Sequence, residues 1–360
     1  MIPYFILISL PLLVWAVGET YRIKYGKKLL LETRSASIDI FMLMFFFLLA
    51  FRGLQCGNDT RQYFNLFNKY TEYSFYQLFS NYNNEIGYKL LNKLIGATTN
   101  SYQLLLALTS FLCVYPVWWF YRRESTNHIL TIVLFLSVFP YMMFFSGIRQ
   151  AMAIALGVPA WYAAKSKKLF RFIFIVLFAM LFHTSAFMLA AIYPLYYAKI
   201  TKKWLWFVVP CMVIVFFLRT IIFNFLITLL WQEYDHTSPT GAINILILLV
   251  LFGLYAYILP DEKSLDQDTV AMRNILLLSI VIQIFAMLHP LSMRMNYYFL
   301  LFVPLLIPKI ARHSKKQFSQ VSKLSVVVMT VYFAYYFVNT VITDNDPLNI
   351  FPYIPFWENG

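Results

Sequence analysis

The sequence predicts an all-α, polytopic membrane protein. Of its 360 residues, 61% are hydrophobic and only 12% are charged, and the mean hydropathy is +0.65. Soluble globular chains are about one-quarter charged, so this composition excludes an ordinary soluble domain. With 19% aromatic residues and only 11 glycines, it also excludes a disordered or low-complexity chain.

Twelve apolar stretches are long enough, or nearly so, to cross a bilayer. They cover about 2–18, 38–51, 101–121, 128–145, 150–164, 170–182, 185–198, 204–230, 242–259, 274–290, 296–310 and 324–343. Several are short, which predicts broken helices or a locally thinned bilayer. The first has no basic residue before its apolar core, so we expect a retained span and not a cleavable signal peptide.

The distribution of Lys and Arg predicts the orientation. Alternate connections, beginning with residues 19–37, hold 21 of the 29 basic residues. Basic loops stay in the cytoplasm, so twelve spans would place both termini outside. The net charge of +13 is therefore a topology signal, and no clustered basic face indicates nucleic-acid binding.

One connection is long. Residues 52–100, on the outer side, contain no spanning run, yet ten of the 28 residues between Arg61 and Tyr88 are aromatic. Their helical spacing predicts amphipathic helices at the outer interface. The other loops are short, which predicts a single transmembrane domain over residues 1–360.

The other eight basic residues lie on the outer side or within a span, where the preference of basic loops for the cytoplasm predicts few of them. Arg52, Arg149 and Arg294 each lie in a short outer connection, at the depth of a lipid headgroup. Arginine suits bidentate phosphate recognition in a partly dry site, so we expect this trio to hold an anion. Arg219 interrupts an apolar stretch and is equally explained by pairing within the bundle. Interfacial snorkelling accounts for three lysines of the long loop: Lys69, Lys89 and Lys93.

Asp59, Glu85 and His183 are the candidates for proton transfer. Asp59 lies in a Gly-Asn-Asp-Thr turn, Glu85 opens an apolar helical run, and His183 lies between two short apolar runs. Either carboxylate could serve as a base, orient an arginine or simply begin a helix. His183 could act as a base, although a lone histidine is more often a structural hydrogen-bonding residue.

Metal and redox chemistry have no sequence signal. The three cysteines form no C-x-x-C pair, and no D-x-D, P-loop, G-x-S-x-G or H-E-x-x-H pattern is present. The sequence predicts no metal site and no cofactor.

The ordered motifs resemble the EpsG family of bacterial polysaccharide polymerases, which is related to the Wzy-type O-antigen and capsule polymerases. The resemblance covers roughly residues 50 to 300, and its most specific parts are Gly-Ile-Arg149-Gln150 and His183-Thr-Ser-Ala. The looser parts are Arg52-Gly followed by Gly-Asn-Asp59-Thr and Tyr63, then Glu85-Ile-Gly-Tyr88, and Arg294-Met-Asn-Tyr-Tyr298.

The resemblance implies a GT-C-like glycosyltransferase that polymerises undecaprenyl-diphosphate-linked oligosaccharide repeats on the outer face of the bacterial cytoplasmic (inner) membrane. Lipid-linked oligosaccharide would be both donor and acceptor, membrane lipid would surround the protein, and a chain-length regulator protein would be a partner. The reaction would be metal-independent.

The resemblance also implies roles for the individual motif residues in this glycosyl transfer. Arg52, Arg149, Arg294 and Gln150 would bind the diphosphate, and Asp59, Glu85 or His183 would be the base or its orienter. Further substrate contacts are expected from six residues: Arg61, Tyr63, Tyr88, Arg219, Tyr297 and Tyr298. The aromatic outer loop, with Asn81, Asn83 and Asn84, would contribute to a sugar cleft; an interfacial aromatic belt explains it equally well.

Two other functions remain open at this point. A lipid-linked oligosaccharide flippase or transporter would be expected to have two related halves and charges deep within its spans, whereas these charges collect near one surface. An O-antigen ligase would catalyse the same kind of glycosyl transfer as a polymerase, and only the sequence motifs distinguish the two.

Overall fold

The computed structural model describes residues 1–25, 30–80, 85–138, 141–230 and 242–358. The described chain is nearly all-helical, and two isolated β-bridges are the only strand-like pairing in these ranges. It divides into two compact units, residues 1–189 with 327–360 and residues 190–326. The single transmembrane domain stays a prediction.

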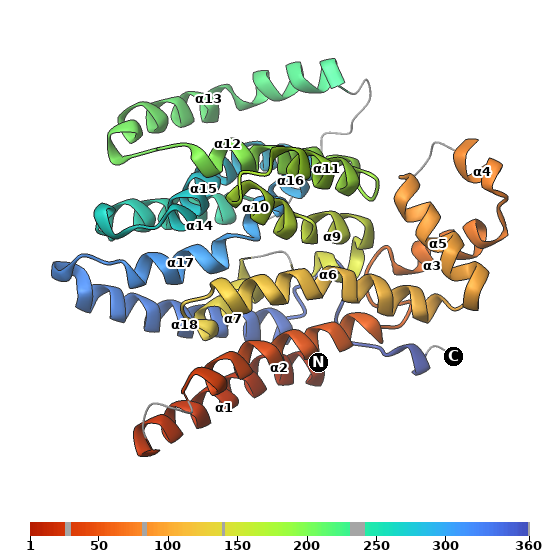
Figure 1. Cartoon of the computed structure of the whole chain (residues 1–360), viewed down its shortest axis with the longest axis horizontal. Coiled ribbons are helices and arrows are strands. Elements are labelled where there is room, and N and C mark those ends of the chain that lie inside the picture. The colour runs from red at the N-terminus through yellow and green to blue at the C-terminus, as the bar shows by residue number, and fades with distance from the viewer. Residues whose placement is uncertain (26–29, 81–84, 139–140, 231–241, 359–360) are drawn as a thin grey trace. The chain divides into compact units, whose positions relative to one another are not determined.

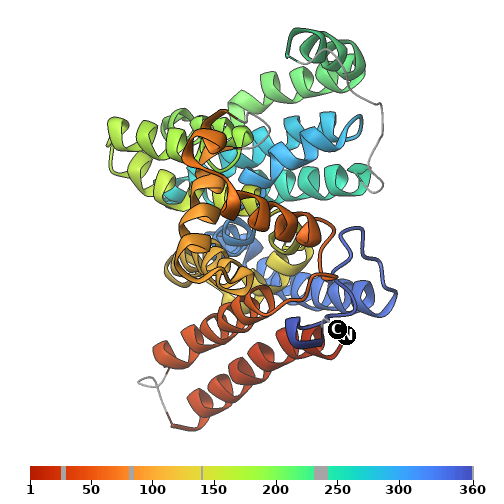
Figure 2. The same cartoon turned by 90° about the vertical axis from the view of Figure 1, so that its right-hand side faces the viewer.

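The first unit begins with two long helices that pack side by side as a hairpin, α1 and α2 (Figure 2). The helices of this unit up to residue 180 are α1 (Ile2–Tyr25), α2 (Leu30–Ala50), α3 (Thr60–Glu72), α4 (Phe75–Ser80), α5 (Ile86–Thr99), α6 (Tyr102–Glu124), α7 (His128–Ser137), α8 (Met143–Ser146), α9 (Ile148–Ala155), α10 (Gly157–Lys165) and α11 (Leu169–Met180). A 3₁₀ segment, Thr184–Ala191, follows α11.

The second unit contains the remaining helices, with α18 crossing the boundary between the units. They are α12 (Ile192–Tyr197), α13 (Leu205–Leu230), α14 (Ala242–Ile258), α15 (Gln267–Ala286), α16 (Pro290–Leu300), α17 (Val303–Arg312) and α18 (Ser319–Ile342). Short 3₁₀ turns of this unit lie at Lys202–Trp204, Glu262–Ser264 and Lys316–Phe318, and a further one at Phe356–Glu358 belongs to the first unit.

Five helices in the described residues are long and apolar enough to span a membrane, or six if the bent pair α16 and α17 forms one span. The expected twelve spans are therefore not confirmed. The stretch 128–164, predicted as two spans, folds into four helices of four to ten residues. At 1.5 Å per residue, none of these reaches across a hydrocarbon core of about 30 Å.

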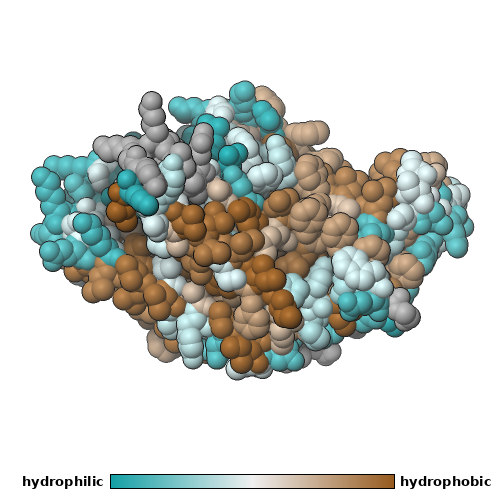
Figure 3. Space-filling view, turned by 90° about the horizontal axis from the view of Figure 1, so that it is seen from below, coloured by the Kyte–Doolittle hydropathy of each residue, from teal (hydrophilic) through white to brown (hydrophobic). Residues whose placement is uncertain are grey.

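Apolar side chains are abundant on the surface. Large hydrophobic residues are exposed along α1, α6, α13, α14 and α18. Figure 3 shows hydrophobic residues occupying the middle of one face, with hydrophilic residues gathered at its edges. Such a surface is suited to lipid, and the chain is a membrane protein.

The long predicted loop contains α3, α4 and α5, and α3 and α5 pack side by side (Figure 1). The apolar spacing of α3 places Tyr63, Phe67 and Tyr70 on its buried face, whereas Tyr76 in α4 is exposed. Lys89 differs from the snorkelling expectation, because it is buried and its Nζ donates to the carbonyl of Leu78 at 3.3 Å. The carbonyl near the end of α4 gives this ammonium a partner inside the protein.

Both ends of the chain meet the loop that follows α2 (Figure 2). The hydroxyl of Tyr4 donates to the carbonyl of Ile350 at 2.6 Å. The amide of Gly53 donates to Ile354 at 2.7 Å, and the amide of Gly57 donates to Asn349 at 2.7 Å. We call residues 346–356 the C-terminal tail.

Candidate functional site

One carboxylate joins three segments of the first unit. Glu85 precedes α5 in an extended conformation, and its side chain makes no cap hydrogen bond. Arg149 Nη1 donates to Glu85 Oε2 at 2.5 Å, and His183 Nδ1 lies 2.9 Å from Glu85 Oε1. The backbone amide of Thr184 also donates to Oε1, at 3.3 Å. We call Glu85, Arg149 and His183 the charged cluster.

The charged cluster is partly accessible. The side chains of Glu85, Arg149 and His183 are 14%, 24% and 26% exposed. These fractions leave the three groups semi-enclosed, where ion pairs are stronger than in water but a ligand can still reach them.

The hydrogen bond to Glu85 sets the state of the histidine ring. An ionised carboxylate can only accept, so Nδ1–H of His183 donates to Glu85. In the neutral ring, Nε2 is then the proton acceptor. Within the described residues, no hydrogen bond occupies Nε2. A carboxylate that holds an imidazole in this way leaves the other nitrogen suited to act as a base.

The electrostatics keep Glu85 ionised. Burial favours its neutral form, but the hydrogen bond from His183 and the charge of Arg149 outweigh burial and lower the pKa of Glu85 to about 2. A carboxylate that holds its proton so weakly is a poor general base at neutral pH. Glu85 therefore fits the role of orienting His183 and Arg149 better than that of accepting a proton.

A glycine brings Glu85 to His183. The amide of Gly87 donates to the carbonyl of Leu181 at 2.8 Å, just after α11 ends. A Cβ on Gly87 would lie only 2.8 Å from that carbonyl oxygen, closer than real Cβ contacts occur. The glycine of the Glu-Ile-Gly-Tyr motif thus allows the start of α5 to lie against the segment that bears His183.

Aromatic rings support Arg149. Its guanidinium lies 5.8 Å from the ring centroid of Tyr63, which is buried on α3. Tyr63 packs edge-on against Tyr88 of α5, with ring centroids 5.5 Å apart. Gln150 follows Arg149 in α9 and is buried. The stacked ring fixes the guanidinium in place, and Tyr63 and Tyr88 thereby act on the site through Arg149.

Asp59 lies near this cluster without joining it. It precedes α3 and makes no side-chain cap, while its backbone amide donates to Ser146 Oγ at 3.3 Å. Gly57, with φ of +97°, approaches the carbonyl of Phe145 so closely that a Cβ would lie 2.8 Å away. No ion pair joins Asp59 to Arg149 in the described ranges. Asp59 is thus held beside the turn that precedes α9.

Arg52 and Arg61 occupy different surroundings. Arg52 is 1% exposed, and its Nη1 donates to the carbonyl of Leu49 at the end of α2. A cation at this position satisfies a carbonyl at the helix C-terminus and complements the helix dipole. Arg61 is exposed on α3. Neither contacts Glu85 in the described chain, so their substrate roles stay predictions.

Four predicted residues belong to the second unit. Arg294 is exposed on α16, and Tyr297 and Tyr298 are buried on the same helix. Arg219 on α13 donates from Nη1 to the carbonyl of Phe216 at 2.6 Å and lies 4.5 Å from its ring centroid. Both contacts lie within α13 itself, so they decide neither between pairing within the bundle nor for a substrate contact. As substrate ligands, all four stay predictions, and Asn81, Asn83 and Asn84 lie outside the described residues.

The C-terminal tail was missed by the sequence reasoning. Asp346 accepts from the amides of Leu348 at 3.2 Å and Phe351 at 2.5 Å, which shapes the tail against residues 53–58. The available signal was an Asp-Pro turn after the last apolar stretch, followed by four aromatic residues and two further prolines.

No group of three or more His, Cys, Asp or Glu side chains in the described ranges is arranged to hold a metal ion. The charged cluster itself offers three groups: a cation held over an aromatic ring, an ionised carboxylate and an imidazole with an accepting nitrogen.

Comparison with known proteins gives one match. No curated protein and no solved structure matches the chain. The EpsG family matches residues 37–354, which include the charged cluster and nearly all of the C-terminal tail. Because the match covers most of the sequence, the chain belongs to the EpsG family of Wzy-like, polysaccharide-polymerase-type membrane proteins.

Proposed function

We propose that this protein is a metal-independent glycosyltransferase that polymerises undecaprenyl-diphosphate-linked oligosaccharide repeats on the outer face of the cytoplasmic membrane. Family membership supports a role in polysaccharide biosynthesis. The contact of Glu85 with both Arg149 and His183 supports catalysis, because it joins an anion-binding group to a base.

The proposed reaction breaks the bond between the sugar and the lipid diphosphate of the growing chain. An acceptor sugar hydroxyl of a fresh repeat attacks the anomeric carbon, and the released diphosphate carries away the bonding electrons. Arg149 stabilises the charge that develops on the diphosphate. His183 Nε2 takes the hydroxyl proton, and Glu85 stabilises the imidazolium that results.

The charge balance of the cluster indicates that further cations take part. Glu85 neutralises most of the charge of Arg149, whereas a diphosphate brings at least two negative charges. Arg61 is an exposed arginine of the first unit, and we propose that it contributes to the diphosphate site.

The test is the length of the polymer in the native host. The gene is deleted and restored as wild type, Arg149→Ala or Lys69→Ala, and surface polysaccharide is separated on a gel. Lys69 is an exposed cation of α3 outside the charged cluster and is the matched control. We expect single repeats after deletion and with Arg149→Ala, and a full ladder with Lys69→Ala, at equal membrane levels.

Other results favour the other functions. Loss of all surface repeats with accumulation of lipid-linked repeats would favour a flippase or a ligase. An unchanged ladder after deletion would refute the assignment.

A further inference from the structure

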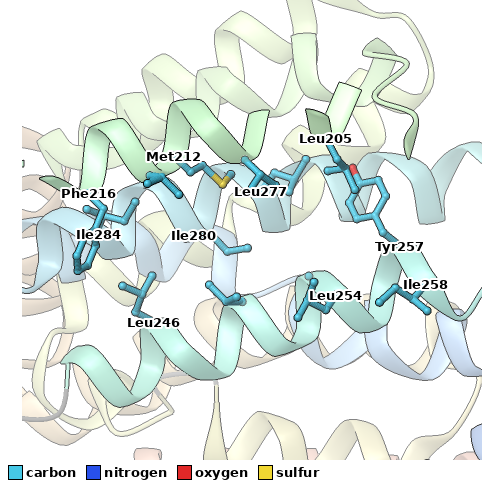
Figure 4. Close-up of a pocket in the computed structure, with 14 residues that line it drawn as sticks. Leu205, Met212, Phe216, Leu246, Leu254, Tyr257, Ile258, Leu277, Ile280 and Ile284 are labelled. Carbon is cyan, nitrogen blue, oxygen red and sulfur yellow. The ribbon is translucent and has the colours of Figure 1, made fainter. Parts of the chain in front are cut away.

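The second unit contains an apolar groove of about 320 Å³ between α13, α14 and α15 (Figure 4). Its lining is hydrophobic throughout, apart from the ring of Tyr257 at one end, and includes Val209, Met212, Val250, Leu254 and Leu277. Gly253 lies within it, where a Cβ would come within 3.1 Å of Ile280 Cδ1. The missing side chain deepens the groove along α14.

The groove faces outward from the unit. None of the residues in the apolar window of α13 is buried, and side chains such as Phe217 are largely exposed. For a helix that is hydrophobic on all sides, this exposure indicates a lipid environment. An elongated apolar molecule can therefore enter the groove from the side.

One end of the groove is positively charged. Leu205, Tyr257 and Ile258 lie together at this end (Figure 4). Lys202 is one turn before Leu205, and Lys315 Nζ reaches the carbonyl of Ile258 at 3.4 Å. The two ammonium groups come from different loops. Burial and the charge of Lys315 both lower the pKa of Lys202, as expected for neighbouring cations.

The acidic side chains of these loops are mostly engaged elsewhere, and Glu262 alone also acts on Lys202 electrostatically. Glu262 forms two hydrogen bonds with the guanidinium of Arg273, at 2.8 and 3.1 Å. Asp261 accepts from the amide of Lys263 at 3.2 Å, and Asp266 accepts from the amide of Thr269 at 2.7 Å. Glu262 offsets the repulsion between the two lysines only in part, because its carboxylate also binds Arg273, and an external anion would relieve the remainder.

We propose that this groove binds an anionic membrane phospholipid, with one acyl chain along α13 and α14 and the phosphate between Lys202 and Lys315. The combination of an apolar slot and a basic end matches a lipid that has both parts. The loops concerned are among those that the basic-residue distribution places in the cytoplasm, so the lipid belongs to the inner leaflet. This site is independent of the proposed glycosyl transfer at the outer face.

The test measures lipid binding by native mass spectrometry of the full-length protein in detergent. Phosphatidylglycerol and phosphatidylcholine with identical acyl chains are titrated separately. We expect tight binding of one phosphatidylglycerol and much weaker binding of phosphatidylcholine. Inorganic phosphate is expected not to displace the phosphatidylglycerol, because it lacks the acyl chain.

Two variants separate the two parts of the site. Lys202→Gln with Lys315→Gln should weaken phosphatidylglycerol binding about 30-fold, since each lysine contributes about fivefold. Val250→Trp should fill the groove and weaken both lipids. The matched control, Lys203→Gln with Lys316→Gln, removes two neighbouring exposed charges and should leave binding unchanged. Thermal unfolding establishes that each variant is folded.

Four results would overturn the proposal. The first two are equal binding of the two phospholipids and an equal loss in the control pair. The third is a dimer that Val250→Trp dissociates without changing lipid binding, which would assign the groove to a second copy of the chain. Displacement by inorganic phosphate alone would likewise reduce the site to a simple anion site.

Discussion

Replacing Glu85 by glutamine tests whether the charged cluster is a catalytic device or only a structural ion pair. The substitution keeps the size of the side chain and removes its charge. It weakens the hydrogen bonds from Arg149 at 2.5 Å and His183 at 2.9 Å. A glutamine amide can also donate to Nδ1, which would place the ring proton on Nε2 and remove the base.

The magnitude follows from the pKa of Glu85. A fall from 4.5 to about 2 corresponds to about 3 kcal/mol of preferential stabilisation of the ionised form. Because the folded-state pKa is lowered, this stabilisation is present above pH 4.5 and is lost as the pH falls towards 2. Glu85→Gln should lower the thermal unfolding temperature at pH 7 and abolish this acid-dependent loss.

The rate should fall much further than stability requires. We expect Glu85→Gln to slow polymerisation roughly 10²- to 10⁴-fold, the usual contribution of a general base. The assay uses purified protein in nanodiscs with lipid-linked repeats and follows chain growth. If Glu85 acts through His183, the double variant with His183→Ala should be no slower than His183→Ala alone.

The control is Glu72→Gln, which changes an exposed carboxylate of α3 outside the cluster and should leave both rate and stability unchanged. The reasoning would be refuted by a Glu85→Gln enzyme that unfolds at a lower temperature but polymerises at the wild-type rate. The ion pair would then be structural only, and Asp59 would become the strongest candidate for the base.

Four further predictions follow from the same contacts. Gly87→Ala should separate α5 from the carbonyl of Leu181 and lower both activity and unfolding temperature, while Ala97→Ser on the exposed face of α5 should change neither. Arg149→Lys should keep the charge but lose most polymer length on a gel, because an ammonium cannot contact Glu85 and a phosphate in the geometry of a guanidinium. Asp346→Ala removes the acceptor of two tail amides and should cost about 1–3 kcal/mol in denaturant unfolding. Asp344→Asn, at a left-handed position that asparagine tolerates, should have no such cost. Polymerisation in nanodiscs should continue in excess EDTA, and its loss with recovery on adding a divalent cation would contradict the metal-independent mechanism.

The sequence was most informative about the few charged residues of an otherwise apolar chain. Arg149, Glu85 and His183 are polar residues in an apolar chain, and the charge distribution assigned all three to one side of the membrane. The structure brings these three side chains into contact. Their positions in the sequence could not predict that they lie close together in space. The packing of Gly87 against Leu181 produces that contact, and it depends on tertiary structure alone.

Continuity of helices was the weakest part of the prediction. Hydropathy measures how apolar a stretch is, but not whether its helix is unbroken. The stretch 128–164 is apolar almost throughout, yet its helices end and restart around Gly147 and Leu156. Arg52 illustrates the same limit, because its position suggested an accessible headgroup ligand and its side chain is buried against the end of α2.

The hydrogen bonds between the tail and the loop after α2, together with that from Tyr4 to Ile350, predict an even number of membrane crossings between Tyr4 and Ile350. A polypeptide whose beginning and end are fastened together on one side of a bilayer must traverse it an even number of times. Twelve crossings satisfy this rule, as do six, and five do not. We therefore expect reporter enzymes fused to the two ends to agree with each other, whichever compartment they report.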